Sequence, residues 1–348
     1  MGDRHAMRNP AVLLFAVLGA AFAAPTWTLL DSGVTATTLR GVSAVSDTVA
    51  WASGSRSTVL RTADAGATWQ KVTVTADAVD FRDIDAIDAN TCYVLSIGNG
   101  PASRIYKTTD AGATWTLQFK NEDPKVFLDA MSFWDANHGI AFSDSSDGRL
   151  VILTTSDGGK TWARVPPEAL PPALDNEGAF AASGTNIAVL GSSDAWIGTG
   201  AAATARVLRT HDRGKTWQVA NTPIIAGASA GIYSVAFRDA RHGIVVGGDY
   251  SKETEAIDNI ALTTDGGVTW TLVKEHALSG FRSVVAYVPH AKTPTLIAIG
   301  PRGSDVSTDD GRTWTALEGP GFHTFSFSPT GAVGFAAAGG GRLAKLKW

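Results

Sequence analysis

The side chains in this sequence that could do chemistry are carboxylates and arginines, which recur in turns between apolar segments. Paired carboxyl groups hydrolyse glycosidic bonds, because one donates a proton while the other acts as base or nucleophile. Arginine forks bind polar or anionic groups through parallel hydrogen bonds. The candidate catalytic carboxylates are Asp129, Glu177, Asp144 and Asp249. The candidate binding residues are Arg56, Arg104, Asp144, Arg149, Glu177, Asp249, Tyr250, Arg282, Asp305 and His323.

Several other chemistries lack their sequence patterns. The run Asp83-Ile84-Asp85 does not have the glycine and distal glutamate of a Ca²⁺ loop, so we expect strand residues there, flanked by solvent-facing acids. No histidines and cysteines cluster at metal-ligand spacing, and the sole cysteine, Cys92, follows an alternating stretch typical of a buried strand. No G-x-S-x-G elbow, phosphate-binding loop, dinucleotide fingerprint or haem motif is present. We therefore expect no metal and no cofactor.

One eight-residue pattern, Ser/Thr-x-Asp-x-Gly-x-Thr-Trp, recurs six times along the chain. The repeats stand at intervals of roughly 45–55 residues, about the length of one four-stranded propeller blade. The aspartate and tryptophan of each repeat are Asp64 and Trp69, Asp110 and Trp115, Asp157 and Trp162, Asp212 and Trp217, Asp265 and Trp270, and Asp309 and Trp314.

The repeated pattern predicts a hairpin between two strands. The glycine allows a backbone conformation with positive φ, and the aspartate can accept hydrogen bonds from N–H groups of its own loop. The tryptophan buries a large apolar area against its blade, so we expect each Trp→Ala substitution to cost about 3–5 kcal/mol. These residues are expected to hold the fold and to take no part in catalysis.

The two ends of the chain together predict a seventh blade. The segment 27–30 resembles the strand after a repeat but has no repeat before it, and segments 324–327, 332–337 and 342–346 read as strands with no repeat after them. Pairing the two ends would close the ring and remove a free sheet edge. The prediction is an all-β fold: a seven-bladed β-propeller of four-stranded blades, a single domain over residues 24–348, with the last blade closed by both termini.

Strand alternation within a blade divides the turns between two faces. The repeats and the turns between the first and second strands share one face. The turns between the second and third strands, and the connections that enter each first strand, share the opposite face around the central channel. Loops converge there, so we expect the ligand site on that face. All the candidate binding residues fall on it, and the inserted segments 166–172 and 221–231 are expected to border it.

The first residues predict export. Arg4 and Arg8 precede an apolar run at 11–21, and the Ala21-Phe22-Ala23 triplet is typical of a signal-peptidase site, so residues 1–23 read as a signal peptide. We expect a periplasmic or secreted monomer with no transmembrane segment after cleavage. The net charge of −4 and the absence of a basic stripe argue against nucleic acid as a partner.

Several motifs resemble a known family. The repeat is similar to the Asp-box, or BNR repeat, of sialidases and related propellers. The motifs Phe127-Leu128-Asp129-Ala130, His138-Gly139 and Gly247-Gly248-Asp249-Tyr250 resemble the photosystem II stability/assembly factor family, whose bacterial branch is often labelled oxidoreductase or glycosyl hydrolase. This resemblance covers the whole mature chain. It implies a seven-bladed propeller with a chaperone-like role in assembling a membrane complex.

Two functions therefore stay open on the sequence alone. The first is a binding or assembly scaffold that holds a protein partner, or a polar or glycan ligand, at the channel face. The alternative is a glycoside hydrolase that uses paired carboxylates there, although the Arg-Ile-Pro motif of sialidases is absent.

Overall fold

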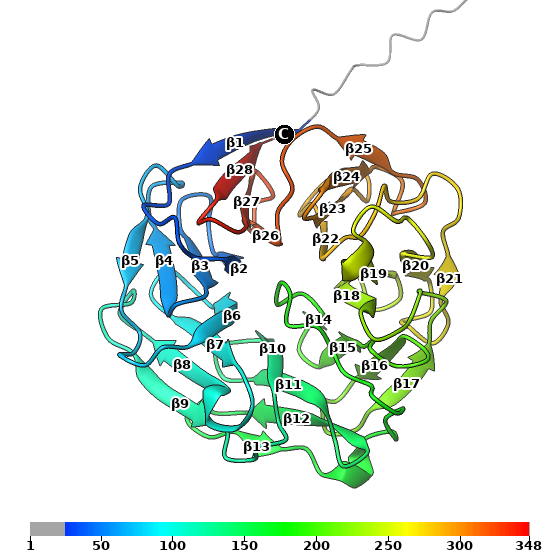
Figure 1. Ribbon diagram of the computed structural model, residues 1–348, viewed down its shortest axis with the longest axis horizontal. Helices are drawn as coiled ribbons and strands as arrows, with labels where there is room; N and C mark the ends of the chain where they lie inside the picture. Colours follow the sequence, from blue (N-terminus) through cyan, green and yellow to red (C-terminus); the bar gives the residue numbers. More distant parts are fainter. Residues whose placement is uncertain (1–24, 348) are drawn as a thin grey trace, which may run out of the picture.

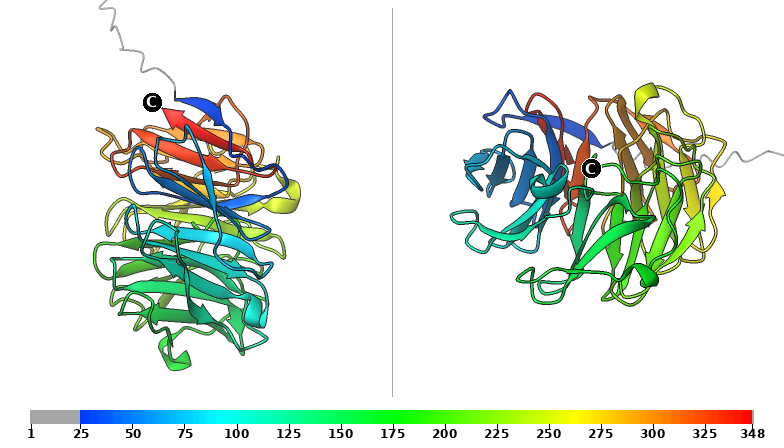
Figure 2. Two further views of the ribbon diagram at one scale, coloured as in Figure 1. Left: turned by 90° about the vertical axis from the view of Figure 1, so that its left-hand side faces the viewer. Right: turned by 60° about the horizontal axis from the view of Figure 1, so that its bottom comes forward.

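The computed structural model describes residues 25–347; the predicted signal peptide lies outside the described residues, and so does Trp348. Seven antiparallel sheets of four strands each stand in a ring around a central channel (Figure 1). Seen from the side, the sheets form a thick disc with turns on both of its faces (Figure 2). The predicted all-β, seven-bladed propeller is confirmed.

Blades I to VI each run in sequence order from an inner strand at the channel to an outer strand at the rim. Blades I to III are β2 to β5 (Leu39–Ala44, Ala50–Gly54, Thr58–Thr62, Gln70–Val72), β6 to β9 (Asp80–Ala86, Cys92–Ile97, Arg104–Thr108, Thr116–Lys120) and β10 to β13 (Leu128–Phe133, Gly139–Ser146, Arg149–Thr155, Ala163–Arg164). Blades IV and V are β14 to β17 (Ile187–Leu190, Asp194–Gly198, Arg206–Thr210, Gln218–Asn221) and β18 to β21 (Ala230–Phe237, Gly243–Asp249, Ile260–Thr263, Thr271–Leu272).

Blade VI is β22 to β25 (Val284–Tyr287, Leu296–Gly300, Gly303–Ser307, Thr315–Leu317). Blade VII takes β26 to β28 (Thr324–Phe327, Val333–Ala337, Leu343–Lys347) from the C-terminal end and its outer strand, β1 (Thr26–Leu30), from the N-terminal end. Strands β1 and β28 are antiparallel, with Thr26 opposite Lys347 and Leu30 opposite Leu343. The predicted closure of the ring by both ends is therefore confirmed. Three short 3₁₀ helices lie in connections: η1 (Gly100–Ala102), η2 (Pro167–Ala169) and η3 (Tyr250–Lys252).

The six repeats form the hairpins between the third and fourth strands of blades I to VI. In the first, the Asp64 carboxylate accepts hydrogen bonds from the Thr68 N–H at 2.9 Å and the Thr68 hydroxyl at 2.6 Å. The Thr62 hydroxyl accepts from the N–H of Gly66, whose φ of 84° suits glycine. The other five repeats make the same bonds. The repeat is thus a self-contained turn whose aspartate is already satisfied.

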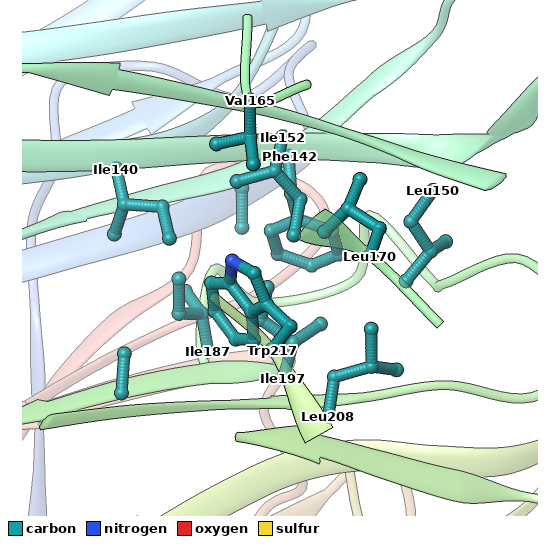
Figure 3. Packing of buried hydrophobic residues seen from close by; sticks show 12 residues of the cluster. Ile140, Phe142, Leu150, Ile152, Val165, Leu170, Ile187, Ile197, Leu208 and Trp217 are labelled. Carbon is teal, nitrogen blue, oxygen red and sulfur yellow. The ribbon is translucent and has the colours of Figure 1, made fainter. Parts of the chain in front are cut away.

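The apolar core consists of seven clusters, one between each pair of neighbouring blades. The cluster between blades III and IV shows the arrangement: the Trp217 ring packs among aliphatic side chains from both sheets (Figure 3). Trp217 and Trp314 are only 7% exposed, and their indole N–H groups donate to the carbonyls of Gly214 and Gly311. The other four repeat tryptophans are half-buried. Cys92 is wholly buried in β7, as predicted.

The inner strands are also joined by side chains across blade boundaries. Asp83 and Asp85 of β6 accept hydrogen bonds from the N–H groups of Met131 and Phe133 in β10, at 2.7 and 2.9 Å. The prediction that these two acids face solvent is wrong, because both turn toward the next blade. Asp83 is only 5% exposed. Burial raises the pKa of Asp83 to about 8 and the pKa of Asp85 to about 7.

Candidate functional site

One strand position in four blades carries a bulge that faces the mouth of the channel. The pairing between first and second strands shifts by one residue in β2, β6, β10 and β18. An extra residue of this kind leaves the ladder and re-aims its side chain. The residues at these four shifts are Arg40, Arg82, Asp129 and Tyr233. All four line one cavity.

This cavity has a volume of about 450 Å³ and lies on the face opposite the repeats. Every blade contributes to its wall, including Ser283 and Pro301 from blade VI and His323 from blade VII. The size is that of a pocket for a small molecule or a few residues of peptide. The face on which a ligand site is predicted therefore carries a cavity.

The floor of the cavity is a segment of blade IV that crosses the channel, which we call the plug (residues 179–185). Figure 1 shows it as the green loop beside β14 that reaches the centre of the ring. The Ala181 carbonyl accepts from Arg82 of blade II at 3.0 Å, and Ser183 bonds blades VI and VII through Ser283 and Thr324. Gly184 has a φ of 77° and lies against Asp83, where a β-carbon would meet Oδ1 at 2.0 Å. The plug thus lines the cavity and ties blade IV to blades II, VI and VII.

One wall of the pocket is basic. Arg82 bonds Asp80 at 3.0 Å, whereas Arg40 makes no hydrogen bond or ion pair with any residue between 25 and 347, and its Nε is buried without a partner. Burial, and secondly the Arg82 charge, lower the pKa of Arg40 to about 10. Burial and the Arg40 charge lower the pKa of His323 to about 4, so His323 is neutral at physiological pH. Among the described residues of this wall, Arg40 is the guanidinium that forms no ion pair.

The adjoining wall, from blade III, is acidic. Asp129 is 1% exposed, and its Oδ2 has no hydrogen-bond partner in the described part of the chain. Burial, and then the nearby Asp144 charge, raise the pKa of Asp129 well above its usual range. Asp144 Oδ1 accepts from the Ala179 N–H at 2.9 Å, and burial raises the pKa of Asp144 as well. The pocket therefore holds a protonatable acid beside a second carboxyl group.

Aromatic rings complete the pocket. Phe180 of the plug stacks on Tyr233 with ring centroids 4.1 Å apart. Tyr250 meets both rings edge-on, and Phe281 meets Tyr233 edge-on at 4.6 Å. Tyr250 is 53% exposed and stands at the rim. Such rings offer large contact areas at low conformational cost, which suits capture of a ligand.

Three of the predicted site residues form buried ion pairs and are not among the residues that line the pocket. Glu177 is 1% exposed, bonds the Thr199 hydroxyl at 2.7 Å and pairs with Arg206 of β16. Arg282 and Asp305 are 2% and 1% exposed and pair with Nε at 2.6 Å from Oδ2. Each pair ties one blade's entry to its own third strand.

Four more predicted residues lie outside the pocket lining. Arg104 pairs with Asp77, and Arg149 donates to the Gly148 carbonyl at 2.8 Å. Asp249 accepts from Ser229 and Ser251 at 2.7 Å, and Arg56 is exposed in the turn after β3. Of the predicted residues, the pocket brings together Asp129, Asp144, Tyr250 and His323.

Sequence reasoning missed Arg40, Arg82 and Phe180 as pocket residues. The first two could have been found by aligning the blades. Arg40 and Arg82 then share one column of the alignment, directly after the leading apolar residue of each inner strand, as in Leu39-Arg40-Gly41 and Phe81-Arg82-Asp83. The same column holds Asp129, Tyr233, Arg282 and His323. Phe180 had no such signal, because the plug interrupts the repeat in blade IV.

Residues 25–347 contain no group of three or more histidine, cysteine or carboxylate residues placed to hold a metal ion. Within the same range, no helix is long and apolar enough to cross a membrane. The side chains that line the pocket offer carboxyl, guanidinium, imidazole and aromatic groups.

The fold and the pocket define a class: a seven-bladed propeller with a charged and aromatic pocket at one channel mouth. In structure, the chain is similar to YCF48 bound to a D1 peptide, with a TM-score of 0.65, 19% identity, and coverage of 96% of this chain and 100% of that one. YCF48 from Cyanidioschyzon merolae has a TM-score of 0.63, 16% identity and coverage of 93% and 99%.

A third similar structure is the GH74 xyloglucanase from Xanthomonas campestris, with a TM-score of 0.64 and 16% identity. The match covers 92% of this chain but 53% of the xyloglucanase. At these identities the likeness shows the fold alone. No protein-family model matches the chain, and no curated protein does.

Proposed function

We propose that the protein is an exported binding propeller that captures a segment of a protein partner in the channel-mouth pocket. The observation that carries this proposal is the pocket itself, in which Arg40 and Asp144 form no ion pair, and Asp129 Oδ2 no hydrogen bond, with any residue between 25 and 347. Unpaired charges in a partly buried site cost free energy, and a bound partner would compensate them. The structural likeness to YCF48, solved with a D1 peptide bound, supports a peptide as the ligand.

The pocket fits a peptide better than an extended interface. Its volume of about 450 Å³ accommodates a few side chains, and its aromatic rings can anchor them. Arg40 can bind a carboxylate or a backbone carbonyl, since a guanidinium offers several donors in one plane.

Site-specific crosslinking tests this function. A photoreactive phenylalanine analogue at position 250 is expected to capture a partner polypeptide from the native extract, because Tyr250 lies at the pocket rim. The same analogue at Val268, 50% exposed in the fifth repeat on the opposite face, is the matched control and should give no adduct. Filling the pocket with Ala182→Trp should abolish the adduct at 250. Equal adducts at both positions, or adducts that survive Ala182→Trp, would contradict the proposal.

A second candidate function is hydrolysis of a glycosidic bond. It is favoured by Asp129 and Asp144, since a carboxyl group with a raised pKa beside a second carboxyl group is the pair such chemistry needs. Turnover on a panel of plant and bacterial glycans, lost in both Asp129→Asn and Asp144→Asn, would establish it. No turnover by the wild type would exclude it for those glycans.

A further inference from the structure

The two carboxyl groups of the acidic wall form no ion pair with any lysine, arginine or histidine of residues 25–347. Asp144 accepts one N–H, from Ala179, and pairs with no lysine, arginine or histidine in residues 25–347. Asp129 is 1% exposed on the β10 bulge, and its Oδ2 is unpartnered. A carboxylate withdrawn from water loses several kcal/mol of hydration unless a positive group replaces it. Both carboxyl groups can therefore accept hydrogen bonds from a cation that residues 25–347 do not supply.

The surroundings of this wall favour an organic cation. Phe127 precedes Asp129 by two residues, and Phe180 follows Ala179, whose N–H bonds Asp144; both rings line the same pocket. Aromatic faces attract ammonium and guanidinium groups, more strongly where water is excluded. Rings supply no lone pairs to a hydrated metal ion, which prefers six or more oxygen ligands. The two carboxyl groups alone fall short of such a set.

We propose that the blade III wall of the pocket, formed by Asp129, Asp144, Phe127 and Phe180, is a subsite for a primary ammonium or guanidinium group. The source is a lysine or arginine side chain of the captured segment, so this inference deepens the proposed function and rests on it.

The other charged groups of the pocket fix the direction of the ligand. Arg40, Arg82 and the neutral His323 line the basic wall, and Glu253 at the rim pairs with Arg302 at 2.7 Å. A cation is repelled from the Arg40 side and attracted to the Asp144 side. The captured segment therefore places its basic group at blade III and an acceptor group at blades I and II.

A random heptapeptide library displayed on phage provides a test that needs no known partner. Selection on the wild type is expected to enrich lysine or arginine at one fixed position. The best peptide should lose at least about 30-fold in affinity toward Asp144→Asn, as expected for removing one member of a buried charge pair. The asparagine can still accept the Ala179 N–H. Asp147→Asn, which alters an exposed carboxylate of the same blade outside the pocket lining, is the matched control and should bind as the wild type does.

Three further arms separate the alternatives. Asp144→Lys should shift the selected residue from basic to acidic. Calorimetric titration with butylammonium and methylguanidinium chlorides shows whether the free cations bind without a peptide, and calcium chloride tests a metal. Calcium binding that Asp144→Asn removes, with no preference for basic peptides, would overturn the inference.

The failure of this inference differs from the failure of the proposed function. Peptides that bind the wild type but not Ala182→Trp, yet show no basic position, would overturn the cation subsite and leave peptide capture standing. No enrichment over Ala182→Trp would overturn both.

Discussion

The two faces of the propeller differ in how similar the equivalent residues are from one blade to the next. On the repeat face, six hairpins share the same aspartate, glycine and tryptophan and make the same hydrogen bonds. At the channel mouth, one equivalent strand position also repeats, but its residues vary in charge and shape: Arg40, Arg82, Asp129, Tyr233, Arg282 and His323. A position that repeats with one residue type serves the fold, which every blade needs alike. A position that repeats with different types can build an asymmetric site inside a symmetric ring.

The largest expected loss of stability comes from a substitution in a repeat. Trp217→Ala should lower the free energy of unfolding by about 3–5 kcal/mol, because it empties the core between blades III and IV. Urea denaturation measures this loss, and peptide binding at a temperature where the variant is folded should be unchanged. Trp115→Ala should cost clearly less, since Trp115 is half-buried and its indole N–H has no partner in the described chain. Equal losses would show that burial does not set the cost.

The next effect concerns Arg282, which occupies the same strand position as Arg40 but forms a buried ion pair. Arg282→Met should cost about 3 kcal/mol or more, because it leaves the buried Asp305 carboxylate without its counter-ion. Adding Asp305→Leu should restore most of the stability, since an apolar pair replaces the ion pair. Denaturation of the single and double variants measures the coupling. A double variant as unstable as the single one would contradict a simple ion pair.

Arg40→Met should change stability in the opposite direction to Arg282→Met. Removing an unpaired, partly buried charge should raise the free energy of unfolding by about 0.5–1 kcal/mol while peptide affinity falls about 10-fold, as expected where a binding site is held at a cost in stability. Arg56→Met, exposed in a turn outside the pocket lining, is the matched control and should change neither. Thermal melts and peptide titrations measure the two quantities.

The smallest expected effect is a difference in pH response between the faces. Hydrogen bonds from the Thr68 side chain and N–H hold the pKa of Asp64 at about 2, below its unfolded value, so its contribution to stability is lost as pH falls from about 4 to 2. Burial raises the pKa of Asp85 to about 7, so its contribution is complete below about pH 4 and is lost as pH rises through 7.

Melting temperatures of Asp85→Asn and Thr68→Val test this contrast. In Asp85→Asn the melting temperature should vary less with pH between pH 5 and 8, and in Thr68→Val it should vary less between pH 4 and 2. Each difference from the wild type should be about a few degrees. A variant that changes the melting temperature equally at all pH values would show that the altered group does not titrate in the folded protein.

The sequence predicted the fold well because the fold depends on local signals. Each repeat is satisfied by its own hydrogen bonds, so eight residues suffice to recognise it, and the unmatched strands at the two ends imply the closing blade. The face of the site followed from strand alternation alone.

The composition of the pocket was harder to predict, because it depends on which way individual side chains turn. Arg282 and Arg40 share a column, yet Arg282 finds Asp305 in its own blade while Arg40 finds no partner in residues 25–347. Glu177 is predicted to bind a ligand, but its carboxylate is paired with Arg206, which lies 29 residues further along the chain. Bulges, partners and the plug are set by tertiary contacts that no short motif encodes.

The pairing of β1 with β28 has a consequence for synthesis on the ribosome. Among the described strands, β1 is made first and β28, with which it pairs, is made last. During translation β1 is an unpaired edge that can pair with another chain, while blades I to VI can each form from contiguous sequence. The final step of folding is therefore a long-range closure, which is slow compared with hairpin formation. A helper that shields this strand until its partner emerges would raise the yield of closed rings.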